Sequence, residues 1–255
     1  MSKIGENQPI IDKTIVHDDI YDMNPSALTN HLKQPIGEPI NNWVDPKHAG
    51  VPVLAGKHIR LERLAPTHGA DLYQAFSEES DDSTWTYLPY GPFGDIADFQ
   101  QWLIPFSQSD DPWMFALIDL ETQRACGVAS YLRINPSSGS IEIGHIHYAK
   151  RLKKTRAATE VMYLMAEHVF NLGYRRYEWK CDALNQHSQN SAKRLGFSFE
   201  GVFRQATIYK QRNRDTAWLS LLDSEWPSRR SAFLNWLSDE NFDENGCQRK
   251  PLSSF

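Results

Sequence analysis

The sequence has 255 residues, 40% of them hydrophobic, with 8 Trp, 12 Phe and 10 Tyr, so it can bury at least one ample core. A net charge of -5 argues against general nucleic-acid binding, and no stretch approaches the roughly 18 continuous apolar residues of a membrane-spanning helix. The N-terminus has no apolar run of signal-peptide length, and Cys126, Cys181 and Cys247 lack metal-ligand spacing. We therefore expect a cytoplasmic protein with reduced thiols, no metal, and neither nucleic acid nor membrane as a partner.

Residues 1–55 form a polar segment that contains six prolines, which predicts an extension packed on the body of the protein and not a separate domain. Asn24 and Pro25 predict one short helix that runs through Lys33, with the asparagine as its cap. We expect Trp43 to hold the extension to the body. A partner-binding arm is the alternative.

Residues 58–64 alternate between polar and apolar side chains and predict the first core strand. A helix follows from Pro66 and ends at the acidic run 78–82. Residues 84–93 are rich in aromatic side chains, and their prolines and glycine exclude regular structure. This aromatic segment is either a buried plug or the wall of a binding groove. The side chains that would line such a groove are Trp85, Tyr87 and Tyr90.

Residues 95–106 predict a helix capped by Asp95, and residues 113–120 and 125–134 predict a hairpin. Residues 140–147 predict the next strand. Its alternation places His145 and His147 on the same face as two isoleucines, and Glu142 on the opposite face.

A basic segment that includes Arg151, Lys153, Lys154 and Arg156 follows this strand, at the start of a predicted helix that Gly173 ends. A helix N-terminus already carries roughly half a positive charge from aligned peptide dipoles, so this arrangement favours a bound anion. The free N–H groups of the first turn and the side-chain cations would bind a phosphate or pyrophosphate. The alternative is a solvated basic loop.

Residues 174–182 predict another strand, and residues 183–197 predict a loop with a short helix. Residues 198–208 and 216–222 predict the last two strands, joined by the polar turn KQRNRD. Residues 225–255 predict a terminal helix and a tail.

This order of strand, basic loop, helix, strand and short helix resembles the GNAT superfamily of acetyl-CoA-dependent N-acetyltransferases. Within it, the sequence resembles the Rim-type enzymes, which acetylate the N-termini of ribosomal proteins. The resemblance covers residues 57–224, and its most specific portions are residues 141–144 (IEIG), 158–160 (ATE) and 185–201. It implies a mixed α+β fold: a mostly antiparallel twisted sheet of six to seven strands, splayed between the fourth and fifth, with helices on both faces. Residues 56–224 would then be the catalytic domain.

The resemblance also implies a coenzyme site. The loop that anchors acetyl-CoA would run through Lys153, Lys154, Thr155, Arg156, Ala157 and Ala158. The main chain around Ile146, His147 and Tyr148 would polarise the thioester carbonyl, and Asn185 would bond the pantetheine arm. The loop departs from the family pattern in one respect: Arg156 stands where a glycine is expected, and a side chain there restricts how closely backbone approaches the pyrophosphate.

Acetyl transfer to an amine also needs a neutral amine and a stabilised leaving thiolate. Glu142 is the preferred base, directly or through one water, with His145 and His147 as alternatives. An α-amine titrates near 8, so a strong base is optional, and Glu142 also fits an ion-pair role on the sheet. Ser188 would donate a hydrogen bond to the sulfur, because the short helix contains no tyrosine. Asn185 and Ser188 also fit a helix-capping role.

The predicted function is therefore an acetyl-CoA-dependent N-acetyltransferase acting by direct attack in a ternary complex. The acceptor is a protein N-terminus or a small amine-bearing molecule, and the sequence leaves both open. The alternative is a non-catalytic acyl-CoA-binding or interaction module, which the arginine at position 156 keeps open. The oligomeric state is also open, with a homodimer as one option.

Overall fold

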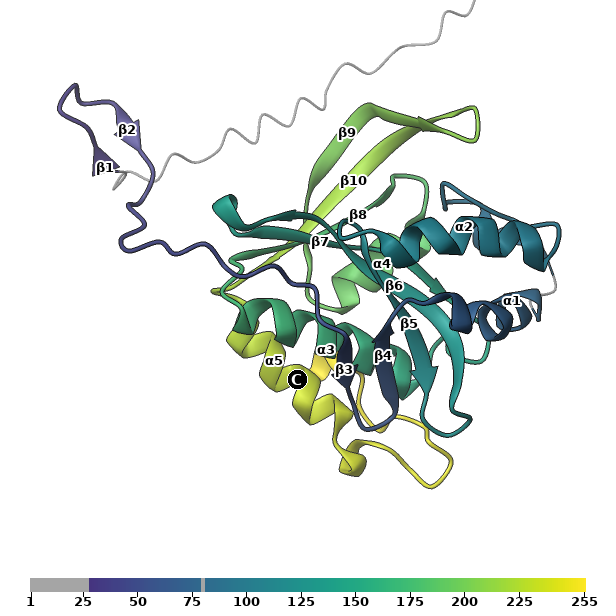
Figure 1. The fold of residues 1–255 in the computed structure, drawn as a ribbon. Coiled ribbons are helices and arrows are strands. Elements are labelled where there is room, and N and C mark those ends of the chain that lie inside the picture. Colours follow the sequence, from purple (N-terminus) through teal and green to yellow (C-terminus); the bar gives the residue numbers. More distant parts are fainter. Residues whose placement is uncertain (1–27, 79–80) are drawn as a thin grey trace, which may run out of the picture. The chain divides into compact units, whose positions relative to one another are not determined.

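The computed structural model of the chain describes residues 28–78 and 81–255 (Figure 1). The chain divides into two compact units, Met1–Val44 and Asp45–Phe255. In the first unit, β1 (Leu28–Thr29) pairs antiparallel with β2 (Pro35–Ile36).

The predicted helix through Lys33 is wrong for the part that the structure describes. The Asn30 side chain accepts hydrogen bonds from the backbone N–H of Leu32 and Gln34 and so turns the chain into a hairpin. Lys33 takes a left-handed conformation with φ 61°, which a helix does not tolerate. Residues 24–27 of that prediction lie outside the described residues.

The second unit contains an eight-stranded sheet in the order β3-β4-β5-β6-β7-β8-β10-β9. Every neighbouring pair is antiparallel except β7 and β8. The predicted mixed α+β fold with a mostly antiparallel sheet is confirmed. Its strands are β3 (Val53–Ala55), β4 (Ile59–Arg63), β5 (Trp113–Asp119), β6 (Arg124–Asn135), β7 (Ser140–Tyr148), β8 (Arg176–Asp182), β9 (Ser198–Tyr209) and β10 (Arg212–Leu222).

The sheet has more than the expected six to seven strands because β3, within the predicted extension, pairs with β4. The last hairpin is also longer than predicted, since β10 begins at Arg212 and only two residues separate it from β9.

Helices cover both faces of the sheet (Figure 1). They are α1 (Gly69–Ser77), α2 (Ile96–Gln108), α3 (Arg156–Asn171), α4 (Gln186–Arg194) and α5 (Trp226–Leu237). Short 3₁₀ turns are η1 (Pro66–His68), η2 (Asp82–Trp85), η3 (Pro136–Ser138), η4 (Asp239–Asn241) and η5 (Leu252–Ser254). Gly173 ends α3 with φ 94°, as its position in the sequence predicts.

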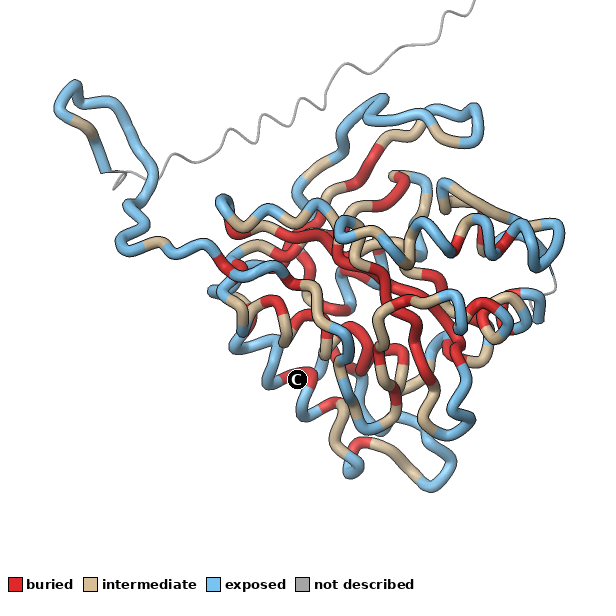
Figure 2. Tube along the Cα trace, in the orientation of Figure 1, coloured by how far each residue is buried: buried red, intermediate tan, exposed pale blue. Residues whose placement is uncertain are grey.

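Successive residues of the central strands point to opposite faces of the sheet and contribute to two hydrophobic cores, one on each face (Figure 2). On β5, Phe115 and Leu117 pack with α3, whereas Met114 and Ala116 pack with α1 and α2. The buried residues therefore lie along the sheet and on the helix faces that meet it.

A buried carboxylate fixes α3 against the start of β4. Glu160 accepts backbone N–H groups of Lys57 at 2.8 Å, His58 at 2.7 Å and Ile59 at 3.1 Å. Gly56 has no room for a side chain, because an added Cβ would lie 2.6 Å from the Glu160 carboxyl carbon. This clamp fixes the helix whose first turn the sequence assigns to anion binding.

The strands β7 and β8 diverge, as predicted for the fourth and fifth core strands. They pair only where residues 140–143 face residues 176–179. Just beyond, β7 carries a bulge: Gly144 pairs with Ser130 and His147 with Val128, so one extra residue is inserted, and His145 has φ 49°. The divergence opens the sheet beside α4.

Candidate active site

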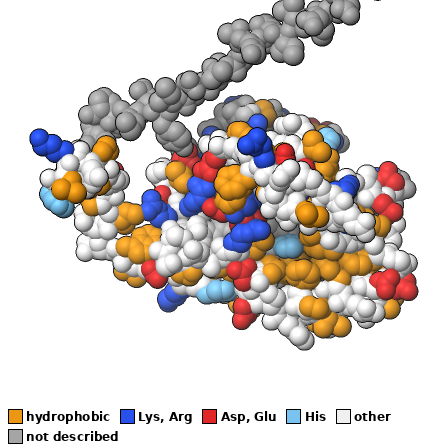
Figure 3. Space-filling view, turned by 90° about the horizontal axis from the view of Figure 1, so that it is seen from above, with side chains coloured by type: hydrophobic (Ala, Val, Ile, Leu, Met, Phe, Trp, Pro, Cys, Tyr) orange, Lys and Arg blue, Asp and Glu red, His pale blue; other side chains and the backbone are white. Residues whose placement is uncertain are grey.

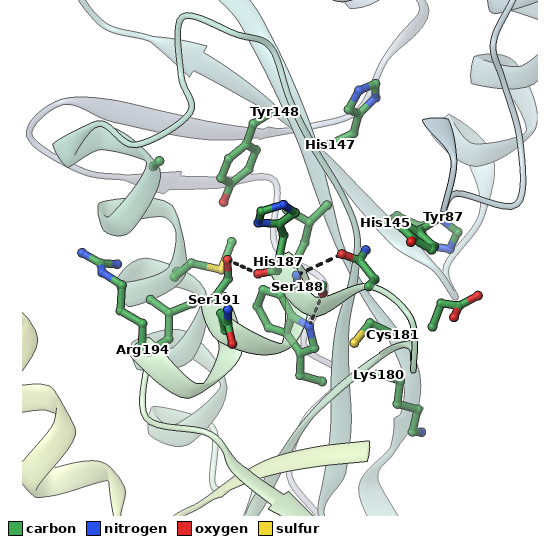
Figure 4. Close-up of a pocket in the computed structure, with 18 of the residues that line it drawn as sticks. Tyr87, His145, His147, Tyr148, Lys180, Cys181, His187, Ser188, Ser191 and Arg194 are labelled. Atoms are coloured by element: carbon green, nitrogen blue, oxygen red, sulfur yellow. Dashed lines mark hydrogen bonds between the residues drawn. The ribbon is translucent and has the colours of Figure 1, made fainter. Parts of the chain in front are cut away.

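A cavity of about 1890 Å³ lies at the divergence of β7 and β8 (Figure 4). One side is formed by α4, with His187, Ser188, Ser191 and Arg194, and another by β8, with Lys180 and Cys181. The cavity reaches the first turn of α3 at one end and the β9–β10 hairpin at the other. Seen from above, the middle of the molecular surface carries Lys and Arg side chains beside hydrophobic ones (Figure 3).

Most of the predicted site residues line this one cavity. They are Glu142, Ile146, His147, Tyr148, Lys153, Lys154, Thr155, Arg156, Ala158, Asn185, Ser188 and Tyr87. Ala157, Trp85 and Tyr90 are not in its wall.

Of the three groove candidates in the aromatic segment, Trp85 and Tyr90 do not line the cavity, which corrects the expectation for these two. Trp85 is only 6% exposed and packs edge-on against Phe76 and His147. Tyr90 stacks on His145 and donates to or accepts from its Nδ1 at 3.1 Å. Only Tyr87 reaches the cavity, where its hydroxyl donates to the Leu184 carbonyl.

The first turn of α3 forms the anion end of the cavity. Thr155 is the N-cap, and its hydroxyl accepts the Ala158 N–H at 3.1 Å. Lys154 takes the left-handed conformation, with φ 63°, that a loop glycine would otherwise supply. Arg156 is the first residue of the helix, so the backbone at that position needs no glycine.

Two of the four cations at this end already have carboxylate partners. Arg151 pairs with Glu78 at 3.3 Å, and Arg156 pairs with Asp239 at 2.8 Å while its guanidinium lies over the Phe242 ring. Arg156 also donates to the Leu237 carbonyl. The electrostatic argument for a bound anion therefore depends mainly on Lys154 and the amides of the first helical turn.

Asn185 and Ser188 lie together at the start of α4. Asn185 is the N-cap, and its side-chain oxygen accepts the Ser188 N–H at 3.0 Å. The Ser188 hydroxyl accepts the Trp179 indole N–H at 3.0 Å and lines the cavity (Figure 4). A hydroxyl is both donor and acceptor, so Ser188 can also donate its proton to a sulfur, and Cys181 lies within its reach.

Glu142 lies in the cavity wall as part of a buried ion-pair group. Its Oε2 is 2.7 Å from Arg133 Nη1 and 2.9 Å from Lys180 Nζ. Lys180 also pairs with Glu178 at 2.7 Å and lies over the Trp218 ring. Burial raises the pKa of Glu142, while Lys180 and then Arg133 oppose that rise. The ion-pair contacts expected as an alternative are thus present, and the carboxylate still faces the cavity.

The two strand histidines are packed and neutral. Burial lowers the pKa of His147 to about 3 and that of His145 to about 4. His147 stacks on Phe76 at 4.0 Å between ring centroids and shares a hydrogen bond with Thr84 at 2.9 Å. Their side chains therefore fit the packing role that competes with a role as base.

The comparisons with known proteins agree with this geometry. The model of the acetyltransferase (GNAT) domain matches residues 58–198, more than half of the chain. The chain belongs to the GNAT acetyltransferase family. No curated protein matches the sequence.

Solved structures of GNAT proteins resemble this one. A GCN5-related N-acetyltransferase from Brucella melitensis has 43% identity and a TM-score of 0.83, over 84% of this chain and 98% of that one. A probable GNAT acetyltransferase from Chromobacterium violaceum ATCC 12472 has 38% identity and a TM-score of 0.71, over 76% and 98%. RimL, a ribosomal L7/L12 α-N-protein acetyltransferase, shares the fold at 19% identity and a TM-score of 0.57, over 67% and 93%.

Two parts of this GNAT cavity were not predicted from the sequence. The β9–β10 hairpin reaches the aromatic segment, where Lys210 donates to the Trp85 carbonyl and Arg212 to the Thr86 carbonyl, each at 2.8 Å. The C-terminal segment contributes Trp236, Phe242 and residues 246–248 to the anion end. Only the polar turn KQRNRD indicated the contact between the hairpin and the aromatic segment, because exposed cations at a hairpin tip are suited to donate to loop carbonyls.

The described parts of this GNAT chain, residues 28–78 and 81–255, contain no helix with the length and apolar character that a membrane crossing needs. Within the same ranges, no cluster of three or more His, Cys, Asp or Glu side chains is arranged to hold a metal ion.

Proposed function

We propose that this protein transfers the acetyl group of acetyl-CoA to a primary amine, by direct attack within a ternary complex in the cytoplasm. The acceptor is a protein N-terminus, which the resemblance to Rim-type enzymes favours, or a small amine-bearing molecule. One observation carries the proposal: the first turn of α3, the divergence of β7 and β8, and Glu142 all belong to a single cavity.

The residues of the anion end fit the coenzyme that the family uses. A helix leaves the N–H groups of its first turn without intrahelical partners, and Thr155 satisfies only that of Ala158. The amides of Arg156 and Ala157, with Lys153 and Lys154 beside them, would bind the diphosphate. Asn185, the N-cap of α4, lines the same cavity, and its side-chain amide suits the amides of pantetheine.

Direct attack needs a polarised carbonyl and a stabilised thiolate. Because β7 and β8 pair only to Ile143, the main chain of Ile146, His147 and Tyr148 has no β8 ladder to satisfy it and would polarise the carbonyl. Ser188 would donate to the sulfur, and Glu142 would accept the amine proton, directly or through water. Burial raises the pKa of Cys181, which makes it a poor nucleophile and disfavours an acyl-cysteine route.

Calorimetric titration with acetyl-CoA and CoA tests the coenzyme site, and thiol release over a panel of amines tests the reaction. We expect saturable binding of one acetyl-CoA per chain and acceptor-dependent release of CoA. Absence of binding would overturn the proposal.

The second candidate is a non-catalytic acyl-CoA-binding or interaction module. The observation that favours it is the commitment of Arg156 to Asp239 and Phe242, which replaces the family's loop glycine with a structural contact. Saturable binding without thiol release for any amine would support this candidate.

A further inference from the structure

The end of the cavity beneath the β9–β10 hairpin contains two arginines without an ion-pair partner. Arg204 of β9 and Arg214 of β10 both line the cavity, and neither pairs with a carboxylate in the described part of the chain. Three other cations of the cavity wall, Arg133, Arg156 and Lys180, each bond a carboxylate.

Arg214 and its neighbour Trp218 also have unused donors. The Nε of Arg214 and the indole Nε1 of Trp218 are both buried and have no acceptor among residues 28–78 and 81–255. Both side chains belong to the cavity wall, four residues apart on β10 and therefore on the same face of the strand. A buried donor without an acceptor is unfavourable, so an acceptor supplied by a ligand would relieve it.

The nearest carboxylates on these strands are occupied elsewhere. Asp182 accepts the Tyr209 hydroxyl at 2.8 Å and the Leu184 N–H at 2.8 Å. Asp215 accepts the Gln205 N–H at 2.7 Å and the Asn213 amide at 3.0 Å. The Gln205 and Asn213 hydrogen bonds and also the nearby charge of Arg204 lower the pKa of Asp215, so Arg214 is the arginine whose charge is left for a ligand.

The strand register places these donors beside the reaction site. Thr216 faces Asp182, the last residue of β8, and Arg214 lies two residues further, roughly 7 Å along the strand. Arg214 faces Thr207 of β9, which also lines the cavity. If the amine of an acceptor lies at the end of β8, a group a few bonds from that amine would thus reach Arg214.

We propose that Arg204 and Arg214, with the Trp218 indole, bind a carboxylate carried by the acceptor a few bonds from its reacting amine. A guanidinium binds a carboxylate through two parallel hydrogen bonds, which fixes its orientation as well as its charge. The inference rests on the proposed acetyl transfer and narrows its substrate class to anionic primary amines. Such an acceptor is either a free amino acid or a peptide with an acidic residue next to its N-terminus.

The test uses matched acceptors in which a carboxylate is replaced by an uncharged amide. One arm compares the standard α-amino acids with their α-carboxamides. The other compares the tetrapeptides Ala-Asp-Asp-Ala and Ala-Asn-Asn-Ala, both amidated at the C-terminus. CoA release gives kcat/KM for each member in the unmodified protein and in its Arg214→Gln and Arg204→Gln variants. The control is Arg175→Gln, whose exposed side chain lies outside the cavity wall.

We expect at least one carboxylate to exceed its amide by about tenfold or more in kcat/KM, and Arg214→Gln to reduce that ratio to about one. Arg175→Gln should keep the ratio, and the arm in which the preference appears identifies the source of the carboxylate. Equal rates for both members of every pair, no reaction of any member, or a preference that survives in both cavity variants would overturn the inference. Calorimetry with acetyl-CoA separates this from failure of the proposed function, which would abolish coenzyme binding itself.

Discussion

Arg156 of α3 donates to Asp239 at 2.8 Å and so joins the first residue of the helix to a segment 83 positions further along the chain. Hydrogen bonds from Lys57 and then from Arg156 lower the pKa of Asp239 to about 2. The side chain that the sequence places in the coenzyme loop is thus directed toward the C-terminal segment.

The first prediction distinguishes the role of the loop lysines in coenzyme binding from the structural role of Arg156. Lys153→Ala combined with Lys154→Ala should raise the KM for acetyl-CoA by about tenfold or more, because charge-assisted contacts to phosphate are lost. Arg156→Ala should change that KM far less and instead lower the Tm. Steady-state kinetics and thermal unfolding measure both. A larger KM effect in Arg156→Ala than in the lysine variant would show that the guanidinium leaves Asp239 to bind the coenzyme.

The second prediction concerns pH. At low pH an amine acceptor is protonated and needs a base, so Glu142→Gln should lower kcat there by roughly a hundredfold and progressively less as pH rises. The wild-type rate should also fall at acid pH, below the pKa of Glu142 that burial raises, because only the ionised carboxylate accepts a proton. The measurement is kcat from pH 5.5 to about 9.

Glu178→Gln is the matched control, since Glu178 bonds the same Lys180 but is absent from the cavity wall. If both variants lose activity equally at every pH, Glu142 has a structural role and the base lies elsewhere.

Local patterns in the sequence predicted the strands and the main helix because their own neighbours determine them. Residues 58–64 and 140–147 alternate, and the structure forms β4 and β7 there. The apolar positions of α3 recur at helical spacing, and Gly173 ends the helix. The bulge in β7 lies next to Gly144, a residue type that often marks such irregularities in strands.

Partners far apart in the chain left no such local trace. Arg156 donates a hydrogen bond to Asp239, and His147 shares one with Thr84 across 63 positions. The sequence around Arg156 or His147 does not reveal these distant partners. The aromatic segment has the same composition as a plug or as a wall, and only packing decides that Trp85 is buried while Tyr87 reaches the cavity. In the first unit, the Asn30 side chain bonds the backbone in competition with helix formation, and the predicted helix did not account for it.

The third prediction tests the short helix. Ser188→Ala should lower kcat by about tenfold with little change in either KM, because the hydrogen bond to sulfur matters most as charge develops. Asn185→Ala should lower stability by about 1 kcal/mol through loss of the cap and raise the KM for acetyl-CoA. Ser191→Ala, one turn along the same helix, is the control. An unchanged kcat in Ser188→Ala would leave that serine with only a structural role.

The fourth prediction concerns the clamp at Glu160. Glu160 is 7% exposed and its carboxylate accepts three backbone N–H groups, so Glu160→Ala leaves these donors, including that of the buried Ile59, without an acceptor. We expect a loss of about 3 kcal/mol or more in the free energy of unfolding, measured by urea denaturation. Glu167→Ala, which removes an exposed pair with Arg230, should cost less than about 1 kcal/mol. Similar losses in the two variants would mean that the start of β4 does not depend on the carboxylate, and that other contacts hold α3 at the coenzyme site.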